Sequence, residues 1–158
     1  MAILAILAVV IAAAYFYSLY HVPPALDFNA LSLTGMDGKQ VELAKLKGKK
    51  LFINFFDTSD DSCLQRIPLI EKAQAAMGKD NSVFLCISDE PVARLDSLRQ
   101  KIGSNLLFLH STKKLSDLKI LNLPTTYILD PKGEMIYKKA GPSDWSSKET
   151  LGELNGAE

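Results

Sequence analysis

The stretch that decides the fold is FINFFDTSDDSCLQRIPLIEK, residues 52–72. It opens within a continuous apolar run, LFINFF at 51–56, which is typical of a strand buried on both faces. Acidic and hydroxyl residues follow at 57–62, and a helical pattern extends over residues 62–77. The apolar stripe of that helix consists of Cys63, Ile67, Ile70 and Ala73. The stretch therefore predicts a strand, a polar turn and a helix in succession.

The composition excludes several classes of protein. The chain has 158 residues, enough for one domain with a sizeable core, and its 18 basic and 18 acidic residues balance. No basic tract interleaves with aromatic residues, so nucleic-acid binding has no support. Two cysteines, Cys63 and Cys86, are too few for a disulfide scaffold, and their spacing fits no common zinc motif. His21 and His110 are too few for a histidine-rich metal site, so we expect no metal and no cofactor.

The first 20 residues form an apolar segment. No Asp, Glu, Lys or Arg precedes Asp27, and residues 1–17 are wholly apolar. Twenty helical residues span about 30 Å, which matches the hydrocarbon core of a bilayer. Tyrosines cluster at one end of the segment, as in an interfacial aromatic belt. We therefore expect a transmembrane anchor over residues 1–20, a stiff linker over 21–26 and a domain over 27–158.

The nature and orientation of the anchor stay open. The AAA at 12–14 offers a small-residue cleavage site for a signal peptide, although the positive start typical of such peptides is missing. A buried core helix is a further alternative, but no polar residue marks a solvent face. Lys39 is the first basic residue of the chain, which leans slightly towards a cytoplasmic domain. Whole domains translocate regardless of their own charge, so charge does not set the orientation.

The rest of the chain alternates strand and helix patterns. We expect hairpin strands in 31–43 around Asp37–Gly38, a strand at 82–88, a helix at 90–103, a strand at 106–110, a helix at 113–121, strands at 125–130 and 134–141, and a helix at 143–154. Strands that alternate with helices form parallel pairs, and the two hairpins add antiparallel pairs. The expected fold class is α/β, with a mixed central sheet and helices on both faces.

Two stretches resemble the thioredoxin-like superfamily, specifically the membrane-tethered TlpA-like branch related to the AhpC/TSA redoxins. GKKLFINFFDTSDDSCLQRIP (48–68) resembles the family's strand, active-site turn and helix, and Pro68 falls where these helices are kinked. LNLPTTYILDPKGEMIYKKAG (121–141) resembles the family's cis-proline loop and last hairpin, with Pro124 at the cis-proline position. The resemblance covers about residues 26–155 and implies a thioredoxin-like fold.

The active-site motif departs from the family's Trp-Cys-x-x-Cys. The corresponding positions are Ser59, Asp60, Asp61, Ser62 and Cys63. In a two-cysteine motif the first thiolate attacks a disulfide and the second thiol resolves the mixed disulfide. Asp60 replaces the first cysteine and can do neither, so the dithiol cycle is impossible within this motif. Asp60 does suit a helix N-cap, where a carboxylate accepts backbone N–H groups. A catalytic carboxylate, or a metal ligand with Asp57 and Asp61, are the alternatives, and no nearby histidine supports a metal.

The two cysteines have different expected roles. Cys63 stands at the third helical position and feels the helix dipole, but the resemblance implies that this position is shielded. A shielded thiol keeps a high pKa and reacts slowly, so we prefer an inert structural cysteine over a slow monothiol. Cys86 lies within a buried strand and is expected in the core. A disulfide between them would need Cα atoms within about 7 Å, which a helix start and a mid-strand position seldom meet.

The loop at Pro124 carries the binding hypothesis. The resemblance implies a cis Leu123–Pro124 bond that exposes the Leu123 backbone to an extended peptide, with Leu123, Pro124 and Thr125 as binding residues. An ordinary turn proline is the alternative. Asn54, on the strand beneath the site, holds the place where some thioredoxins have a buried carboxylate as proton acceptor. An amide cannot accept a proton in that way, although the TlpA-like branch often has Asn here.

Two function hypotheses follow. The first is a membrane-anchored domain, outside the cytoplasm by analogy with the family, that lacks dithiol activity and binds a protein partner through the Pro124 loop and the Asp60 turn. The second is an enzyme that uses Cys63 as a single nucleophile, in thiol–disulfide exchange or in peroxide reduction. The peroxide reading is the weaker, because peroxidases of this superfamily carry Thr where this chain has Asp60, and a carboxylate beside a thiol raises its pKa.

Overall fold

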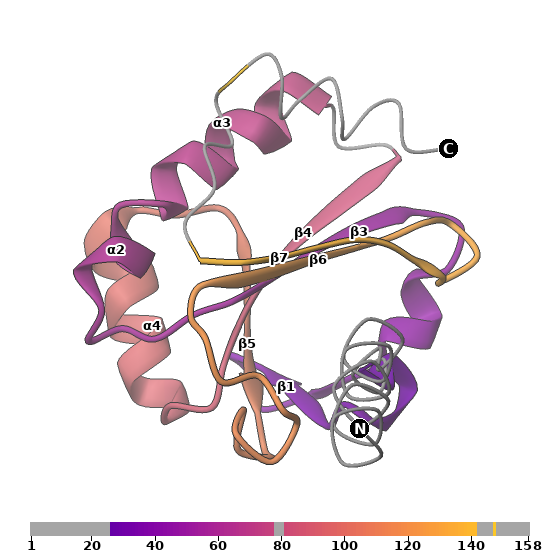
Figure 1. Ribbon diagram of the computed structural model, residues 1–158. Helices are drawn as coiled ribbons and strands as arrows, with labels where there is room; N and C mark the ends of the chain where they lie inside the picture. Colours follow the sequence, from indigo (N-terminus) through magenta and orange to yellow (C-terminus); the bar gives the residue numbers. More distant parts are fainter. Residues whose placement is uncertain (1–25, 78–80, 142–146, 148–158) are drawn as a thin grey trace, which may run out of the picture.

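A seven-stranded mixed sheet forms the centre of the computed structural model, which describes residues 26–77, 81–141 and 147 (Figure 1). The strand order is β2-β1-β5-β4-β3-β6-β7. The strands are β1 (Leu33–Gly35), β2 (Gln40–Val41), β3 (Lys50–Phe55), β4 (Ser82–Ser88), β5 (Leu107–Ser111), β6 (Thr125–Leu129) and β7 (Met135–Ala140). The helices are α2 (Asp61–Leu64), α3 (Ile67–Met77) and α4 (Val92–Ile102), with 3-10 helices η1 (Phe28–Ala30) and η2 (Leu43–Leu46).

Strand pairing follows the expected alternation. β3 pairs with β4 and β4 with β5 in parallel, and helices connect both pairs. The other pairs are antiparallel, including the two predicted hairpins β1–β2 and β6–β7. At the first hairpin Gly38 has φ 78°, a conformation that glycine adopts without steric cost, which explains the Asp-Gly turn. The mixed sheet expected from the sequence is therefore confirmed.

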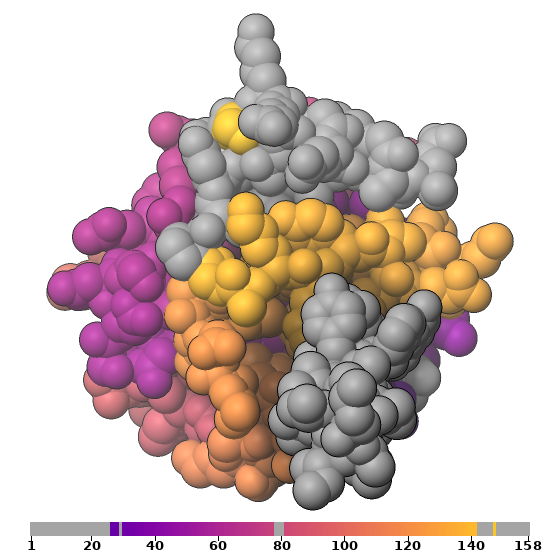
Figure 2. All heavy atoms as spheres, in the orientation of Figure 1, coloured from indigo at the N-terminus to yellow at the C-terminus, as the bar shows by residue number. Residues whose placement is uncertain are grey.

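The central strands are buried on both faces, as their apolar runs predict. Every residue of β6 is buried, and β3 and β4 each have only one residue that is not fully buried. Continuous burial is possible because a separate hydrophobic layer covers each face of the sheet. By contrast, β7 is exposed along most of its length, and its atoms with those of the turn before it form a band across the face in Figure 2.

Within residues 26–77, 81–141 and 147, α-helices cover one face of the sheet, whereas the sequence predicts helices on both faces. One face carries α3 and α4, whose Ile67, Ile70 and Leu95 pack in one core cluster with Phe52 and Phe84. The cluster on the opposite face is closed by Leu31, Leu43, Leu115 and Ile120. Among the described residues that second layer consists of 3-10 helices and turns, because no α-helix there supplies a residue to its cluster.

The expected helix over 113–121 is wrong. The structure has a turn there, and Lys119, with φ 62°, ends it. The Ile120 N–H donates to the Leu115 carbonyl at 2.9 Å, which closes the turn in the manner of a helix C-cap. Leu115 and Ile120 both enter the same core cluster. In a continuing helix residues five apart would point about 140° from each other, so burying both requires the helix to stop.

The expected helix over 62–77 is split in two. α2 ends at Leu64 and α3 begins at Ile67, and the four residues of the predicted apolar stripe are all buried. Pro68 is the second residue of α3, where a missing N–H costs little because the first turn has no partner for it. The predicted interruption near Pro68 is therefore a break between two helices.

Several expectations fall outside the described residues. These are the anchor over 1–20, all of the linker except Leu26, and all of the last helix over 143–154 except Ser147. Within residues 26–77, 81–141 and 147, no helix is long and apolar enough to cross a bilayer.

Candidate functional site

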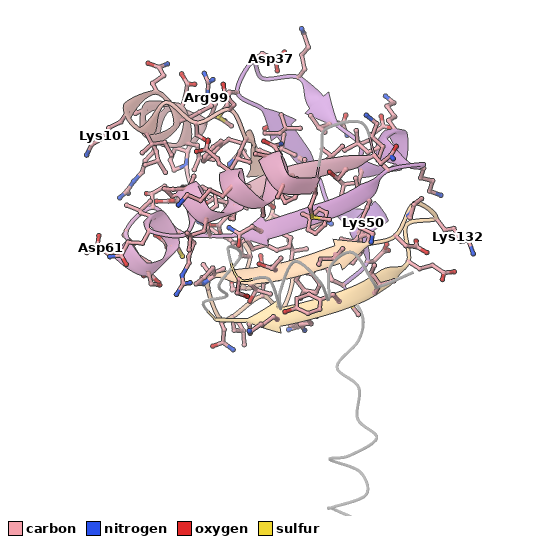
Figure 3. The ribbon with its side chains drawn as sticks, turned by 90° about the horizontal axis from the view of Figure 1, so that it is seen from above. Asp37, Lys50, Asp61, Arg99, Lys101 and Lys132 are labelled. Carbon is pink, nitrogen blue, oxygen red and sulfur yellow. The ribbon has the colours of Figure 1, made fainter. Side chains whose placement is uncertain are left out.

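The candidate site lies where β3 and β4 end. The turn at 57–60 follows β3, and α2 begins at Asp61. β3 starts with Lys50 at the other end of the molecule, and Figure 3 shows Asp61 and Lys50 far apart, with Lys132 near Lys50. Carboxyl ends of parallel strands share one edge of a sheet, so the segments after β3 and β4 can meet there.

Asp60 is the N-cap of α2, as predicted. Its backbone is extended, with φ −98° and ψ 109°, and its Oδ1 accepts the Ser62 N–H at 2.8 Å. Hydrogen bonds from the side chain and backbone of Ser62 hold the pKa of Asp60 below its usual range. The carboxylate is therefore ionised at neutral pH and acts as a hydrogen-bond acceptor at the helix start.

Asp57 shapes the turn in front of this cap. Its Oδ1 accepts the backbone N–H of Ser59 at 2.7 Å and the hydroxyl of Ser59 at 2.6 Å. In this local turn the aspartate side chain takes the place of a backbone carbonyl and accepts the N–H of the residue two positions later. Ser59, which stands in the family's tryptophan position, thus points its hydroxyl back to the chain.

Cys63 is fully buried, with 0% of its surface exposed, and belongs to the core cluster beneath α3. Burial raises the pKa of the thiol, and the negative charges of Asp60 and Asp57 raise it further. A hydrogen bond from the Asp57 backbone opposes the rise of the pKa without reversing it. The thiol is therefore neutral at neutral pH, in line with the expected shielded position.

Cys86 is a core residue of β4, as expected. Burial raises its pKa to about 12, with a smaller contribution from the charge of Glu71. Cys63 and Cys86 are both free thiols, so the disulfide that the sequence disfavoured does not form in the structure.

The Leu123–Pro124 bond is cis, as predicted. Thr125 opens β6 and pairs with Phe55, the last residue of β3, so this loop lies beside the motif turn. The Thr125 hydroxyl donates to the Asn122 carbonyl, and the Pro124 carbonyl accepts the Gly141 N–H at 2.8 Å. The structure thus brings the two predicted segments, the Asp60 turn and the Leu123–Pro124 loop, to one edge of the sheet.

One exposed apolar side chain accompanies this loop. Leu121 is 74% exposed, whereas Leu123 is half-buried and packs against both core clusters. Because Leu123 packs into the core and Leu121 does not, the Leu121 side chain is accessible to another molecule.

Sequence reasoning missed Asp89 and Glu90, which follow β4. The Glu90 carboxylate accepts both the N–H and the hydroxyl of Thr58 at 2.7 Å. Asp89 Oδ2 accepts the Leu115 N–H at 3.0 Å. An acidic pair directly after a buried parallel strand was the available signal, because such strands end at the edge that carries the site.

Asn54 lies beneath the site and is 4% exposed. Its Oδ1 accepts the Thr126 hydroxyl at 3.1 Å, while its Nδ2 finds no hydrogen-bond partner among the described residues. Within those residues no three His, Cys, Asp or Glu side chains gather so that they could hold a metal ion.

Comparisons with known proteins place the chain among thioredoxin-like proteins. The model of the family described as Redoxin matches residues 23–154. The thiol-disulfide oxidoreductase ResA of Bacillus subtilis is 24% identical over 107 residues, which cover 66% of this chain and only 60% of ResA. A putative thiol:disulfide interchange protein DsbE from Chlorobium tepidum has a TM-score of 0.70 at 14% identity, covering 80% of this chain and 91% of its own.

A third similar protein is the exposed lipoprotein thioredoxin Etrx1 of Streptococcus pneumoniae. Its TM-score is 0.61 at 25% identity, and the match covers 78% of this chain and 98% of that one. The structural likenesses confirm the predicted thioredoxin-like fold with its mixed sheet.

Proposed function

This chain belongs to the redoxin family, and on that basis we propose that it is a membrane-tethered thioredoxin-like domain that lacks dithiol activity and binds a protein partner. The membrane tether is the apolar segment at 1–20, and the partner site consists of the Asp60 turn and the Leu123–Pro124 loop. The domain acts outside the cytoplasm. Similarity to an exposed lipoprotein thioredoxin supports that location, and the absence of charge before Asp27 supports the tether.

One observation carries the proposal: Asp60 caps α2 at the position where the family has its attacking thiol. An ionised carboxylate that accepts the Ser62 N–H cannot attack a disulfide sulfur. Reduction of a disulfide needs two electrons from two thiols, and the remaining thiol of the motif, Cys63, is buried and neutral. The substitution keeps the helix start intact and removes the chemistry.

The binding half of the proposal rests on the loop beside the turn. The pairing of Thr125 with Phe55 puts the Leu123 backbone next to the Asp60 turn, where an extended peptide can lie along it. Leu121 offers an exposed apolar contact in the same loop. Asp57, Asp60 and Asp61 add negative charge at the turn, which favours a partner segment that carries basic residues.

A disulfide-reduction assay tests the loss of dithiol activity. We expect the wild-type chain to reduce a protein disulfide, with a dithiol as reductant, no faster than the uncatalysed background. Asp60→Cys restores the i, i+3 spacing of the family's motif, so oxidation of that variant should join residues 60 and 63. Mass spectrometry should then show a loss of two hydrogens within the peptide that contains both. Turnover by the wild type would contradict the proposal.

Site-specific photo-crosslinking tests the partner site. A photoreactive residue at position 121 should give an adduct of one defined mass in the native membrane. The same residue at position 135, which is also exposed and apolar, is the control and should give none. Asp60→Lys should abolish the adduct, because it reverses the charge at the turn. An adduct that forms equally from both positions, or survives Asp60→Lys, would contradict a site built from both segments.

The second candidate function is a monothiol enzyme that uses Cys63. The hydrogen bond from the Asp57 backbone, which acts to lower the pKa of the thiol, favours this reading. Alkylation of Cys63 across pH separates the two candidates. Rapid labelling near pH 6 would favour the enzyme, whereas labelling only above pH 9 or after unfolding would favour the binding module.

A further inference from the structure

We propose that Asp89 and Glu90 are positioning residues that hold the two loops of the partner site, the Asp60 turn and the Leu123–Pro124 loop, in one fixed arrangement. Glu90 fixes the turn that carries Asp60, and Asp89 fixes the turn that leads to Leu123–Pro124. The inference rests on the proposed function, because the two loops act together only if a partner binds across them.

The Glu90 carboxylate binds the turn through a single residue, Thr58. Its Oε2 accepts the Thr58 N–H and its Oε1 accepts the Thr58 hydroxyl, both at 2.7 Å. Arg94 Nε lies 3.2 Å from Oε1, and only 13% of the Glu90 side chain is exposed. Hydrogen bonds to a carboxylate that is shielded from water are stronger than bonds between neutral groups. Thr58, directly ahead of the Ser59–Asp60 turn, is therefore held at both of its polar donors.

The backbone of Glu90 is anchored as well. His110 Nδ1, on β5, lies 2.8 Å from the Glu90 carbonyl oxygen. The Ser88 hydroxyl lies 3.3 Å from both the Glu90 N–H and its Oε2. Glu90 thus links the segment after β3 to the ends of β4 and β5, so the motif turn is tied to the rigid sheet.

Asp89 performs the corresponding task for the other loop. Its Oδ2 accepts the Leu115 N–H at 3.0 Å, and Lys114 Nζ lies 3.8 Å from the same oxygen. Leu115 starts the turn that Ile120 closes, and the Leu123–Pro124 bond follows three residues later. Two adjacent carboxylates therefore set the positions of both loops.

A fixed arrangement matters for binding, because a surface that is already ordered loses less entropy when a partner docks. It also keeps Cys63 shielded, since the segment that Glu90 holds leads directly into α2. Opening of this segment should therefore be visible as faster alkylation of Cys63, whatever the partner is.

The test uses the full-length chain and iodoacetamide, with peptide mass spectrometry to separate Cys63 from Cys86. Glu90→Met removes both acceptors of Thr58 and should raise the rate of Cys63 labelling at pH 8 about tenfold or more. Glu71→Met is the matched control. The Glu71 carboxylate likewise accepts a hydroxyl, from Ser104 at 2.6 Å, and a backbone N–H, from Asn105 at 3.1 Å, but it holds a different loop.

A conservative variant separates positioning from general loss of stability. Glu90→Gln can still accept the Thr58 N–H through its oxygen and donate to the Thr58 hydroxyl, so its labelling rate should stay within about twofold of wild type.

Amide hydrogen exchange measures the opening of each loop separately. Asp89→Ala should speed exchange at Leu115–Ile120, whereas Glu90→Met should speed exchange at Thr58–Cys63.

Equal labelling of Cys63 in Glu90→Met and Glu71→Met, compared at equal global stability, would overturn the proposal. So would labelling of Glu90→Gln as fast as that of Glu90→Met. These results are independent of the photo-crosslinking at position 121. If the partner site does not bind a partner, the adduct at position 121 would therefore be missing, while the pattern of Cys63 labelling would be unchanged.

Discussion

The backbone N–H groups at a helix start can stabilise a reactive thiolate. Here a carboxylate binds to them instead. The N–H groups of the first turn of α2 need acceptors, and Asp60 supplies one for Ser62. Burial raises the pKa of Cys63 and the same negative charge raises it further, so the surviving thiol is less reactive than it would be beside a neutral cap. One substitution thus removes the attacking sulfur and also restrains the remaining one.

The buried thiols predict an alkaline loss of stability. Above pH 9 an unfolded chain ionises its thiols, while the folded chain keeps Cys86 protonated up to about pH 12. The unfolded state then binds fewer protons, so the free energy of unfolding falls as pH rises, by at most about 1.4 kcal/mol per pH unit for this group. Urea unfolding between pH 8 and 10.5 should show a shallower decline in Cys86→Ala than in wild type. Equal slopes would show that the thiol titrates alike in both states.

Asn54 predicts a stabilising double substitution. Its Nδ2 is buried without a partner among the described residues, and a small cavity beside it is lined by Phe52, Ile70 and Phe84. Replacing a buried polar pair by apolar groups removes the cost of burial. Asn54→Val with Thr126→Val should raise the free energy of unfolding by about 1 kcal/mol, measured by urea denaturation. Thr126→Val alone should lower it by about 1–3 kcal/mol, because the Asn54 oxygen also loses its partner.

The turn between β5 and β6 shows how an element is decided by what it must bury. Lys119 adopts φ 62° so that Ile120 can turn back and join Leu115 in the core. A left-handed conformation costs a residue with a Cβ about 1–2 kcal/mol, and glycine escapes that cost at the expense of greater freedom when unfolded.

Lys119→Gly should therefore raise the free energy of unfolding by about 0.5–1 kcal/mol. The reciprocal control is Gly103→Lys at the C-cap of α4, which has the same φ of 62° and where an added Cβ would meet no atom within 4 Å. That variant should be destabilised by a similar amount, and thermal unfolding of both variants measures the pair. A loss of stability in Lys119→Gly would mean that the Lys119 side chain makes contacts that outweigh the backbone strain.

The molecule as a whole has its candidate site and the start of β3 at opposite ends, with Asp61 near one and Lys50 near the other (Figure 3). If residues 1–20 cross the membrane, as the sequence predicts, the domain follows a linker of six residues, 21–26. A linker of that length reaches about 20 Å when extended, so the domain stays close to the bilayer.

We expect the domain to lie outside the cytoplasm. A reporter that is active only in the cytoplasm, fused after Glu158, should be inactive, and one that needs export should be active. The full chain should also sediment with membranes and stay there at high salt. Activity of the cytoplasmic reporter would reverse the orientation, and release of a soluble domain would indicate cleavage near the alanines at 12–14.

The sequence by itself determined where the strands lie along the chain and where the motif stands, whereas the order of the strands within the sheet was not predicted. Apolar runs such as LFINFF indicate strands buried on both faces, and Asp37–Gly38 indicates a turn. Both can be predicted because each signal lies within a short stretch of the chain. The cap at Asp60 was predictable for the same reason, since its acceptor and donor are two residues apart.

Tertiary structure alone decided the features that depend on residues distant in the chain. The residues that Glu90 and Asp89 contact lie 32 and 26 positions away, so no local pattern reveals which residues these two carboxylates hold. The expected helix over 113–121 failed because its propensity is local, whereas the burial of Leu115 and Ile120 against the sheet is not. Local sequence favours conformations one segment at a time, but packing selects the conformation in which all segments can share one core.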